Sequence, residues 1–486
     1  MDAKTLLRKR VGDTPLMRAP HLSSLVGLTD LWLKLEGTNP TGTQKDRVAR
    51  LDVAEAVRRD TEGVTCGTCG NYGVALAHAA YLHGIPCHIF TPESFRGERV
   101  RLMEDLGASV HRVPGSYEDA VNASRAHASS HGLHDANPGG SNTLQAMTGY
   151  TRIADEIVTT LGKSPAAVGV PVGNGTTLAG VHLGFRAAWA RGTTPGLPRV
   201  AGGTSANNNP IDGAKGNQYR PLNPDSVEET EVNEPLVNWD ALDGRAAVEA
   251  VQASGGDSYG ATDQELLELH QALRQDGIEA HPASTAAVHA LQRLVHEHGL
   301  DPTDTYVAVL TSGRPRIMVQ AVEDADVAAL IPVLDGWLGK YSDPSMEINE
   351  AVQAAADKGH ILQAMQGNKI VGYCILTPME LSTFFPHLHL SYIAVDPDAR
   401  GLGVGTRLLE EAIRASNGDL SLHVDVGNDK AIRLYEKFGF ARKYYRMLHR
   451  PDRTPGVDPA QGAGWADPQE GPAGLERTLR ADNLGP

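Results

Sequence analysis

The sequence predicts an α/β protein with a long first part built on parallel β-sheet and a smaller α+β unit after it. Between residues 30 and 320, short aliphatic runs alternate with amphipathic segments, which is the pattern of a parallel sheet covered by helices on both faces. Aromatic residues make up only 5% of the chain, so the core has to rest on Ala, Val, Leu and Ile, as it does in α/β folds. A differently ordered series of strands and helices begins near residue 318.

Each element of the first part is predicted from a buried aliphatic run or from the helical spacing of apolar residues. The expected strands lie at 31–36, 87–92, 109–114, 167–173, 198–204 and 306–313. The expected helices lie at 45–59, 73–83, 95–106, 117–131 and 145–161. Residues 206–235 are polar and rich in Asn, Pro and Glu, so we expect a long surface loop there, either a lid or a segment that controls substrate access.

The second part begins with a strand and an amphipathic helix within residues 318–338. Strands at 361–366 and 369–379 are expected to form a hairpin across a Gly-Asn turn. A strand at 388–397, a helix at 405–416, a strand at 420–426 and a helix at 428–438 follow. We therefore divide the chain into residues 1–317, residues 318–450 and a tail at 451–486, whose Pro and Gly content and lack of periodicity predict disorder.

Charge and cysteine content exclude several classes of partner and compartment. The net charge is −15 and the pI is about 5.7, which disfavours nucleic acid and anionic membranes as partners but leaves room for a local phosphate pocket. Four cysteines in a chain of 486 residues are not a disulfide scaffold, and neither a signal peptide nor an 18-residue apolar stretch is visible. These observations predict a cytoplasmic protein.

A lysine follows a Gly/Thr-rich turn in the segment EGTNPTGTQKDRVA at 36–49. At the start of a helix, Lys45 is placed to form a Schiff base with an aldehyde cofactor. Taken alone, the same lysine is better explained as a solvated residue at a helix N-terminus, because most lysines are solvated. Its interpretation therefore depends on the segments that accompany it.

Two further segments have a glycine-rich turn that runs into a helix, TCGTCGNYGVALAHAA at 65–80 and PVGNGTTLAG at 171–180. Such turns leave backbone N–H groups free for carboxylates or phosphates. The second lacks the lysine of a nucleoside-triphosphate loop and suits a monophosphate. Cys66 and Cys69 have CxxC spacing, but no second pair follows, so we expect no metal site.

Together, these segments resemble the fold-type II pyridoxal phosphate (PLP) enzymes over roughly residues 10–316, and PTGTQKDR, EGTNP and VAVLTSG are most similar to the threonine synthase branch. Cysteine synthases and serine/threonine dehydratases are related branches. The resemblance implies a tryptophan synthase β-like fold with two parallel-sheet subdomains, PLP as cofactor, a small amino acid as substrate and a homodimer.

The resemblance also implies roles for individual residues. Lys45 would carry the Schiff base and shuttle a proton, and Asn71 would bind the PLP 3′-hydroxyl. Thr311, or its neighbour Ser312, would face the pyridine nitrogen, and a neutral hydroxyl there suits elimination or replacement better than transamination. The substrate α-carboxylate would lie among Thr68, Cys69, Gly70 and Tyr72, and the cofactor phosphate would lie on Gly173, Asn174, Gly175, Thr176 and Thr177.

Three positions depart from the pattern of the family. Cys69 stands where Ser is usual, Tyr72 stands where Thr or Ser is usual, and Gln44 precedes the lysine where threonine synthases usually have Phe. Tyr72 is bulkier and is expected to change the room near the substrate. These departures concern the choice of substrate and leave the PLP chemistry intact.

The segment LSYIAVDPDARGLGVGTRLLEEAI at 390–413 has a strand, an Arg-x-x-Gly-x-Gly turn and a helix, and the later helix reads NDKAIRLYEKFGF. The turn offers N–H groups and an arginine to a pyrophosphate. The pair resembles the GNAT acyl-CoA-dependent acyltransferases over about 318–450. It implies acetyl-CoA as co-substrate, with Tyr435 as general acid for the leaving thiolate. Residues implied to bind acyl-CoA are Ile393, Val395, Arg400, Leu402, Gly403, Val404, Gly405, Thr406 and Asn428.

Two functional hypotheses follow. In the first, a PLP-dependent, threonine synthase-like lyase acts on a small amino acid by β- or γ-elimination or replacement, and the GNAT part acylates an amine. In the second, the first half catalyses cysteine synthase-like β-replacement or serine/threonine dehydration, and the GNAT part is a CoA-sensing regulatory module. The family motifs fix no base for the acyltransferase; His387, His389 and Glu380 are candidates by position.

Overall fold

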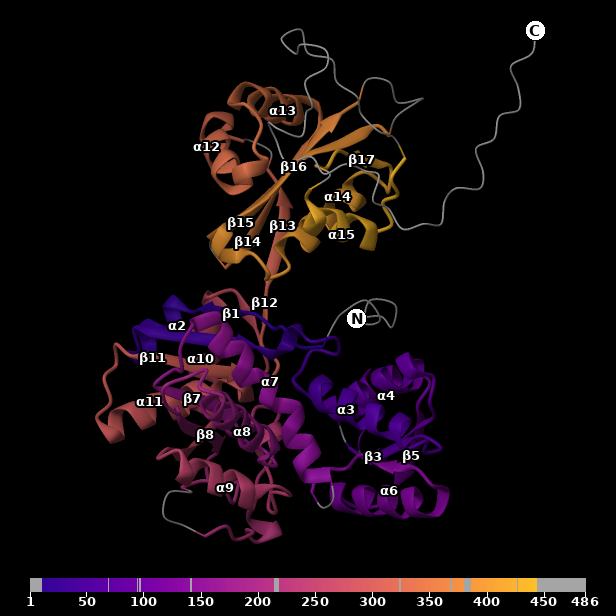
Figure 1. Ribbon diagram of the computed structural model, residues 1–486, viewed down its shortest axis with the longest axis vertical. Coiled ribbons are helices and arrows are strands. Elements are labelled where there is room, and N and C mark those ends of the chain that lie inside the picture. The colour runs from indigo at the N-terminus through magenta and orange to yellow at the C-terminus, as the bar shows by residue number, and fades with distance from the viewer. Residues whose placement is uncertain are drawn as a thin grey trace, which may run out of the picture. The chain divides into compact units, whose positions relative to one another are not determined.

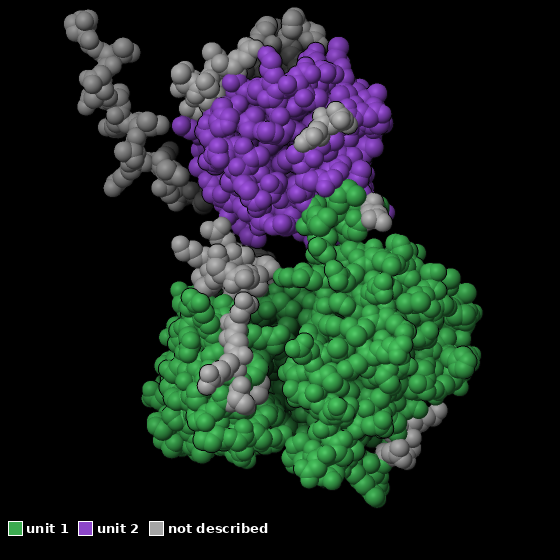
Figure 2. Space-filling view, turned by 180° about the vertical axis from the view of Figure 1, so that it is seen from behind, with its two compact units in different colours: residues 1–318, 365–369 green, residues 319–364, 370–486 purple. Residues whose placement is uncertain are grey.

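The computed structural model describes residues 11–68, 70–93, 95, 98–139, 142–213, 218–322, 325–367, 369–379, 386–425 and 427–443. The chain forms two compact units (Figure 2), residues 1–318 with 365–369 and residues 319–364 with 370–486. Each unit has its own sheets and its own hydrophobic core.

The larger sheet of the first unit has six strands in the order β1-β2-β11-β7-β8-β9. All neighbours are parallel except β1, which pairs antiparallel with β2. The strands are β1 (Leu16–Arg18), β2 (Asp30–Leu35), β7 (Ala167–Pro171), β8 (Arg199–Ser205), β9 (Asp257–Ala261) and β11 (Thr305–Leu310). A short antiparallel pair, β10 (Ile278–Glu279) and β12 (Arg314–Pro315), lies in the same unit.

Both faces of this sheet are buried, because alternate residues of its strands enter different hydrophobic clusters. On β11, Tyr306 and Ala308 belong to one cluster and Val307 and Val309 to the other. Such burial on both faces explains why the strands read as continuous aliphatic runs. The helices of this part are α2 (Pro20–Val26), α7 (Thr143–Leu161), α8 (Thr176–Ala190), α9 (Gly244–Ala253), α10 (Asp263–Gln275) and α11 (Ala286–His298).

The smaller sheet has four parallel strands in the order β5-β4-β3-β6. Helix α6 covers one face of it, and α3 and α4 lie on the other (Figure 1). The strands are β3 (Val64–Gly67), β4 (Cys87–Pro92), β5 (Ser109–Val113) and β6 (His134–Asp135). The helices are α3 (Lys45–Arg58), α4 (Asn71–His83), α5 (Glu98–Asp105) and α6 (Tyr117–His131).

The second unit has a five-stranded sheet in the order β13-β14-β15-β16-β17, in which β16 and β17 are parallel. Helices α12 and α13 pack on one face and α14 on the other (Figure 1). The strands are β13 (Ile317–Ala321), β14 (His360–Gln366), β15 (Lys369–Pro378), β16 (Leu388–Val395) and β17 (Leu420–Leu422). The helices are α12 (Val327–Leu338), α13 (Ser345–Lys358), α14 (Val404–Ala415) and α15 (Asp429–Lys437).

The predicted fold class is confirmed, and the two sheets of the first unit are the two expected parallel-sheet subdomains. Two predicted strands end three and four residues earlier than expected. The strand expected at 306–313 ends at Leu310, because Gly313 N donates back to the Leu310 carbonyl and turns the chain. The strand expected at 420–426 ends at Leu422, where its pairing with β16 ends.

The polar segment 206–235 is a loop, as predicted. Its described residues form only 3₁₀ turns, at Pro224–Ser226 and at the start of Glu234–Leu236. The predicted tail at 451–486 lies outside the described residues. None of the helices in the described ranges combines the length and apolar character that crossing a bilayer requires.

Candidate active site

A buried ionic cluster holds the start of α3 in place. The guanidinium of Arg47 donates to the Glu36 carboxylate through Nε and Nη2, at 2.6 and 2.8 Å. It also donates to both carboxylate oxygens of Glu156, at 2.8 and 2.7 Å. The ammonium of Lys34 donates to Glu156 at 2.6 Å. The cluster therefore ties the first turn of α3 to β2, to the Glu36–Thr38 turn after it and to α7.

The charges of this cluster balance, since two cations face two anions. Burial alone would raise the pKa of Glu156, but its hydrogen bonds to Arg47 and the charge of Lys34 lower that pKa to about 2. Glu36 is fully buried, so loss of Arg47 would leave a carboxylate without a counter-charge inside the protein.

Lys45 is the first residue of α3, two residues before Arg47. The backbone N–H of Gln44 donates to the Thr311 carbonyl at 3.1 Å, so the lysine begins its helix beside the end of β11. Burial lowers the pKa of Lys45, and the carboxylate of Asp243 opposes that shift. A lowered pKa increases the fraction of neutral amine, which is the nucleophilic form.

The glycine-rich turn at 68–72 leads from β3 into α4. Thr68 N donates to the Phe90 carbonyl at 2.8 Å, and Gly70 N donates to the Thr68 hydroxyl at 3.3 Å. Asn71 and Tyr72 are the first two residues of α4, so their backbone N–H groups lie at the N-terminus of that helix. Predicted residue Cys69 lies outside the described residues.

Tyr72 does not extend its hydroxyl toward Lys45. The hydroxyl donates to the Asp52 carboxylate at 2.5 Å and lies 2.7 Å from the Ala136 carbonyl oxygen. Asp52 is also 3.3 Å from Nε2 of His134. The Lys45 ammonium lies 6.0 Å from the centre of the Tyr72 ring. The Tyr72 ring therefore faces Lys45, while its hydroxyl binds the buried carboxylate of Asp52.

The second glycine-rich turn connects β7 to α8. Gly175 has φ of +91°, a left-handed conformation that favours glycine, and starts the helix. A Cβ at Gly173 would lie 2.6 Å from the Pro235 carbonyl oxygen. Asn174 accepts hydrogen bonds from Leu242 N through its side chain and from Asp243 N through its carbonyl. The turn thus lies against the segment that precedes α9.

Sequence reasoning missed Asp243, which is buried beside this turn. Its two carboxylate oxygens accept from the Thr143 hydroxyl at 2.8 Å and from the Thr176 hydroxyl at 2.5 Å. The only local signal is its position just before α9, which by itself indicates a helix cap. The contact with Thr176 is 67 residues away in sequence, so no spacing motif reveals it.

The end of β11 brings hydroxyl groups to the same edge of the sheet. The Thr311 hydroxyl lies 3.3 Å from that of Ser284, and the Ser312 hydroxyl lies 2.9 Å from the same group. Ser312 also accepts from the backbone N–H of His281 at 3.0 Å. Thr311 and Ser312, the residues predicted to face the pyridine nitrogen, thus lie together at the end of β11.

In the second unit, the predicted acyl-CoA residues lie on β16, on the turn before α14, in the first turn of α14 and at the start of α15. Residues of β16 alternate between buried and half-buried, and Ile393 and Val395 are on the half-buried face. Gly403 has φ of +87° and starts α14. The Arg400 side chain is exposed and donates to the Trp337 carbonyl at 2.6 Å. Of the remaining residues predicted to bind, Leu402 is in the turn, and Val404, Gly405 and Thr406 are the first residues of α14.

Tyr435 is buried, and burial raises its pKa to about 12. Asn428 caps α15, since its side chain accepts from Ala431 N at 3.2 Å. Of the candidate bases, His387 pairs with Asp419 at 2.9 Å, and His389 lies 2.9 Å from the Ser421 hydroxyl. Glu380 lies outside the described residues.

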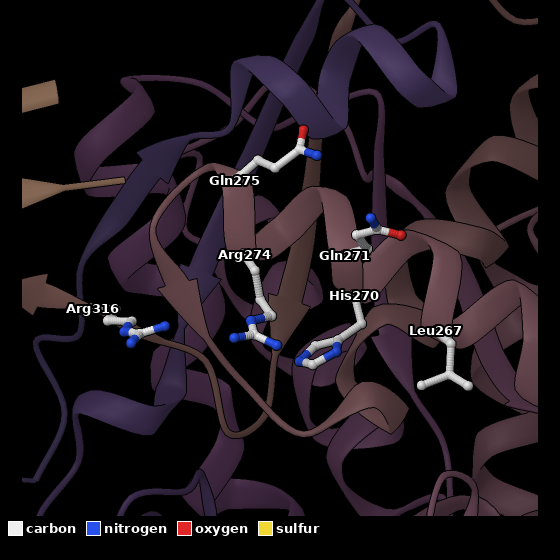
Figure 3. A pocket seen from close by; sticks show the side chains of 6 residues that line it. All are labelled: Leu267, His270, Gln271, Arg274, Gln275 and Arg316. Carbon is white, nitrogen blue, oxygen red and sulfur yellow. The ribbon is translucent and has the colours of Figure 1, made fainter. Parts of the chain in front are cut away.

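A pocket on α10 is separate from the predicted site residues (Figure 3). None of the residues that line it was predicted to bind cofactor or substrate. Its lining consists of Leu267, His270, Gln271, Arg274, Gln275 and Arg316.

Comparison with known proteins gives two family matches. Residues 7–312 match the model of the family described as "Pyridoxal-phosphate dependent enzyme", and residues 331–440 match that of the "Acetyltransferase (GNAT) family". The chain is 30% identical over 324 residues to threonine synthase of Methanosarcina acetivorans, covering 65% of this chain and 78% of that protein. It is 28% identical to threonine synthase of Mycobacterium leprae, covering 66% and 87%.

Solved structures support the fold. Threonine deaminase isoform 2 from Solanum lycopersicum aligns with a TM-score of 0.52 and 17% identity, over 68% of this chain and 91% of that one. O-Acetyl serine sulfhydrylase isoform 3 from Entamoeba histolytica aligns with a TM-score of 0.50 and 19% identity, over 71% and 94%. At these identities the likeness concerns the fold alone.

The ionic cluster predicts an acid-sensitive stability. Because the pKa of Glu156 is about 2 in the folded chain and 4.5 for an ordinary glutamate, its pairing stabilises the fold above pH 4.5 and is lost as the pH falls toward 2. Between pH 4.5 and pH 2, the unfolding free energy of Glu156→Gln should fall less than that of the wild type, by up to about 3 kcal/mol. Urea unfolding at each pH measures both free energies. Glu297→Gln, in an exposed ion pair with Arg293, is the matched control and should leave the slope unchanged.

Proposed function

Because the chain belongs to the pyridoxal-phosphate-dependent enzyme family and carries a GNAT acetyltransferase domain at 331–440, we propose that it is a bifunctional enzyme. Its threonine synthase-like part eliminates or replaces a group at the β or γ carbon of a small amino acid. Its GNAT part transfers an acyl group from acyl-CoA, with acetyl-CoA as the expected donor, to an amine. For these parts we keep the predicted boundaries, residues 1–317 and 318–450.

The observation that carries the first activity is the placement of Lys45. This lysine is partly buried, has a lowered pKa and starts a helix next to the end of β11. The negative charge of Asp243, beside the second glycine-rich turn, acts on its ammonium group. A solvated lysine at a helix N-terminus, the alternative that the sequence left open, would have neither the burial nor the lowered pKa.

The residues fit a pyridoxal phosphate group. The turn at Gly173–Gly175 is a cradle in which a Cβ at either end would collide with the covering segment. When bound, PLP supplies an electron sink for negative charge at the substrate Cα. Thr176 and Thr177 at the start of α8 would hold its phosphate, and the Thr311 hydroxyl would face its ring nitrogen.

Residues of this chain would bind the substrate and move its protons. The Lys45 amine, whose pKa is lowered by burial, would hold the cofactor aldehyde and would take the proton from Cα of the substrate. The N–H groups of Asn71 and Tyr72 at the N-terminus of α4, together with the Thr68 hydroxyl, would bind the α-carboxylate. The Tyr72 ring, fixed by its hydroxyl on Asp52, limits the room beside the lysine.

A cation beside the carboxylate turn favours an anionic substrate. A Cβ on Gly70 would lie 2.9 Å from Nη1 of Arg99, so the guanidinium is next to the turn. An arginine there complements a second anion, such as a phosphate ester on the γ carbon. This supports the threonine synthase-like branch over β-replacement or dehydration.

For the GNAT part, a regulatory role is the second candidate. Two side chains assigned to acyl-CoA are engaged elsewhere, Arg400 with the Trp337 carbonyl and Asn428 as the cap of α15. A domain that binds CoA without transferring the acyl group would tolerate this arrangement. Buried Tyr435, which stays protonated at neutral pH because its pKa is about 12, instead supports a general acid for a leaving thiolate.

Borohydride reduction of the PLP-loaded enzyme followed by peptide mapping tests the first activity. The pyridoxyl group should be on Lys45. Lys45→Ala should lose the visible Schiff-base absorbance and more than about 100-fold of the lyase rate, whereas Lys163→Ala, an exposed lysine after α7, should keep both. A tag on another lysine would contradict the assignment.

Asp243→Asn tests the carboxylate at the phosphate cradle. The amide keeps an acceptor for the Thr176 hydroxyl but removes the negative charge that repels a phosphate dianion. We expect PLP to bind about tenfold more tightly, a difference of about 1.4 kcal/mol, in a fluorescence titration. Asp240→Asn, whose carboxylate accepts from the Tyr219 hydroxyl, is the control. Weaker PLP binding by Asp243→Asn alone would mean that the charge assists the site.

Tyr435→Phe separates the two roles of the GNAT part. The variant keeps the buried ring and should therefore keep the acyl-CoA affinity and the thermal midpoint of the wild type. Acyl transfer to a panel of amino acids, measured as the rate of thiol release, should slow by about 100-fold. Wild-type enzyme that binds acyl-CoA and releases no thiol with any amine in the panel would support the regulatory candidate.

A further inference from the structure

Three histidines meet on one face of the four-stranded sheet, outside the site built around Lys45. His88 is on β4, His111 is on the edge strand β5, and His127 is on α6, which covers that face (Figure 1). His88 pairs in register with Ser109, two residues before His111, so both histidines point to the same side of the sheet.

The separation of the ring nitrogens matches a metal site. Nδ1 of His88 lies 3.2 Å from Nε2 of His111, and one nitrogen from each of the three rings lies within 4.8 Å of the others. In a tetrahedral site with Zn–N bonds of about 2.05 Å, two ligand nitrogens are about 3.3 Å apart. The first pair already has this separation, and a rotation of the His127 side chain would bring the third nitrogen inward.

The chemical state of the rings also suits a metal. Burial, and then repulsion from the neighbouring imidazoles, lowers the pKa of His88, and burial lowers the pKa of His111 and His127. The rings are therefore neutral near pH 7 and offer lone pairs. Within the described ranges, the charged groups that shift these pKa values are other histidines and include no carboxylate.

We propose that His88, His111 and His127 bind one divalent transition metal of the zinc class. Neutral imidazoles are ligands for Zn²⁺, Ni²⁺ and Cu²⁺, and three protein ligands leave a fourth position for water. On binding, the ring that donates the His88–His111 hydrogen bond takes its other tautomer, so its proton moves by way of solvent to the ring nitrogen that does not bind the metal, and both rings stay neutral. The bound ion cross-links β4, β5 and α6 and so stabilises the edge strand of the smaller sheet.

Several features of the surroundings support a built site. The Phe90 ring stacks on His111 at 4.5 Å between centroids and lies 5.3 Å from the His127 ring. An apolar wall of this kind excludes water from one side of the ligands and restrains their orientation. The three histidines are half-buried, so a metal ion has access from solvent.

The test uses the PLP-loaded full chain after dialysis against a chelator. We expect calorimetric titration with ZnCl₂ to show one saturable site and a higher thermal midpoint, and CoCl₂ to give a visible spectrum of low-symmetry Co²⁺. His111→Gln and His127→Gln should each weaken Zn²⁺ binding by more than about 100-fold, beyond the loss expected for an outer-shell partner. His83→Gln, an exposed histidine at the end of α4, should change neither affinity nor spectrum.

Two results would overturn the proposal. One is Zn²⁺ binding weaker than about 1 mM to the wild-type enzyme. The other is a site that survives in both His111→Gln and His127→Gln, which would place the metal on other histidines of the chain. Far-UV circular dichroism checks that each variant is folded, and His88→Gln replaces any variant that is not. Lyase activity is not needed for either readout.

Discussion

The fold around Lys45 depends on the ionic cluster at Arg47. A bidentate guanidinium has a fixed plane, so its simultaneous contacts with Glu36 and Glu156 set the rotation of α3 about its own axis. Replacing a buried pair by apolar residues can be neutral, but removing one member leaves a buried charge and costs about 3–5 kcal/mol. The cluster is therefore better understood as a device that orients α3 than as a net source of stability.

Helix α3 belongs to both halves of the first unit. Its first turn is held by β2 and α7 of the larger sheet through the ionic cluster, while Ala49, Val53 and Ala56 pack in the core of the smaller sheet. Asp52 is seven residues after Lys45, about two turns, and so projects from the same side of the helix. One helix thus places both the proposed Schiff-base lysine and the carboxylate that anchors Tyr72 on the neighbouring turn.

Local sequence predicted the fold class and, within a few residues, those helices and strands that it named, but it named neither β9, α10 nor α13. Those predictions succeeded because strand burial, helical spacing and glycine-rich turns are local patterns. Pairings between distant segments were not predictable: β2 pairs with β11 across more than 200 residues, and Asp243 reaches Thr176 and Thr143 from a separate loop. The three histidines are likewise spread over β4, β5 and α6, so no spacing motif in the sequence marks them as the proposed metal site.

The hydrogen bond between Tyr72 and Asp52 constrains how this pocket can change. Asp52 is buried, and a smaller residue at position 72 would open space beside Lys45 but would also remove a donor from that carboxylate. A single substitution at position 72 therefore carries a folding cost, and a change at both positions avoids leaving the Asp52 carboxylate without this donor. The shape of the protein beside Lys45 is thus coupled to a residue two helical turns further along α3.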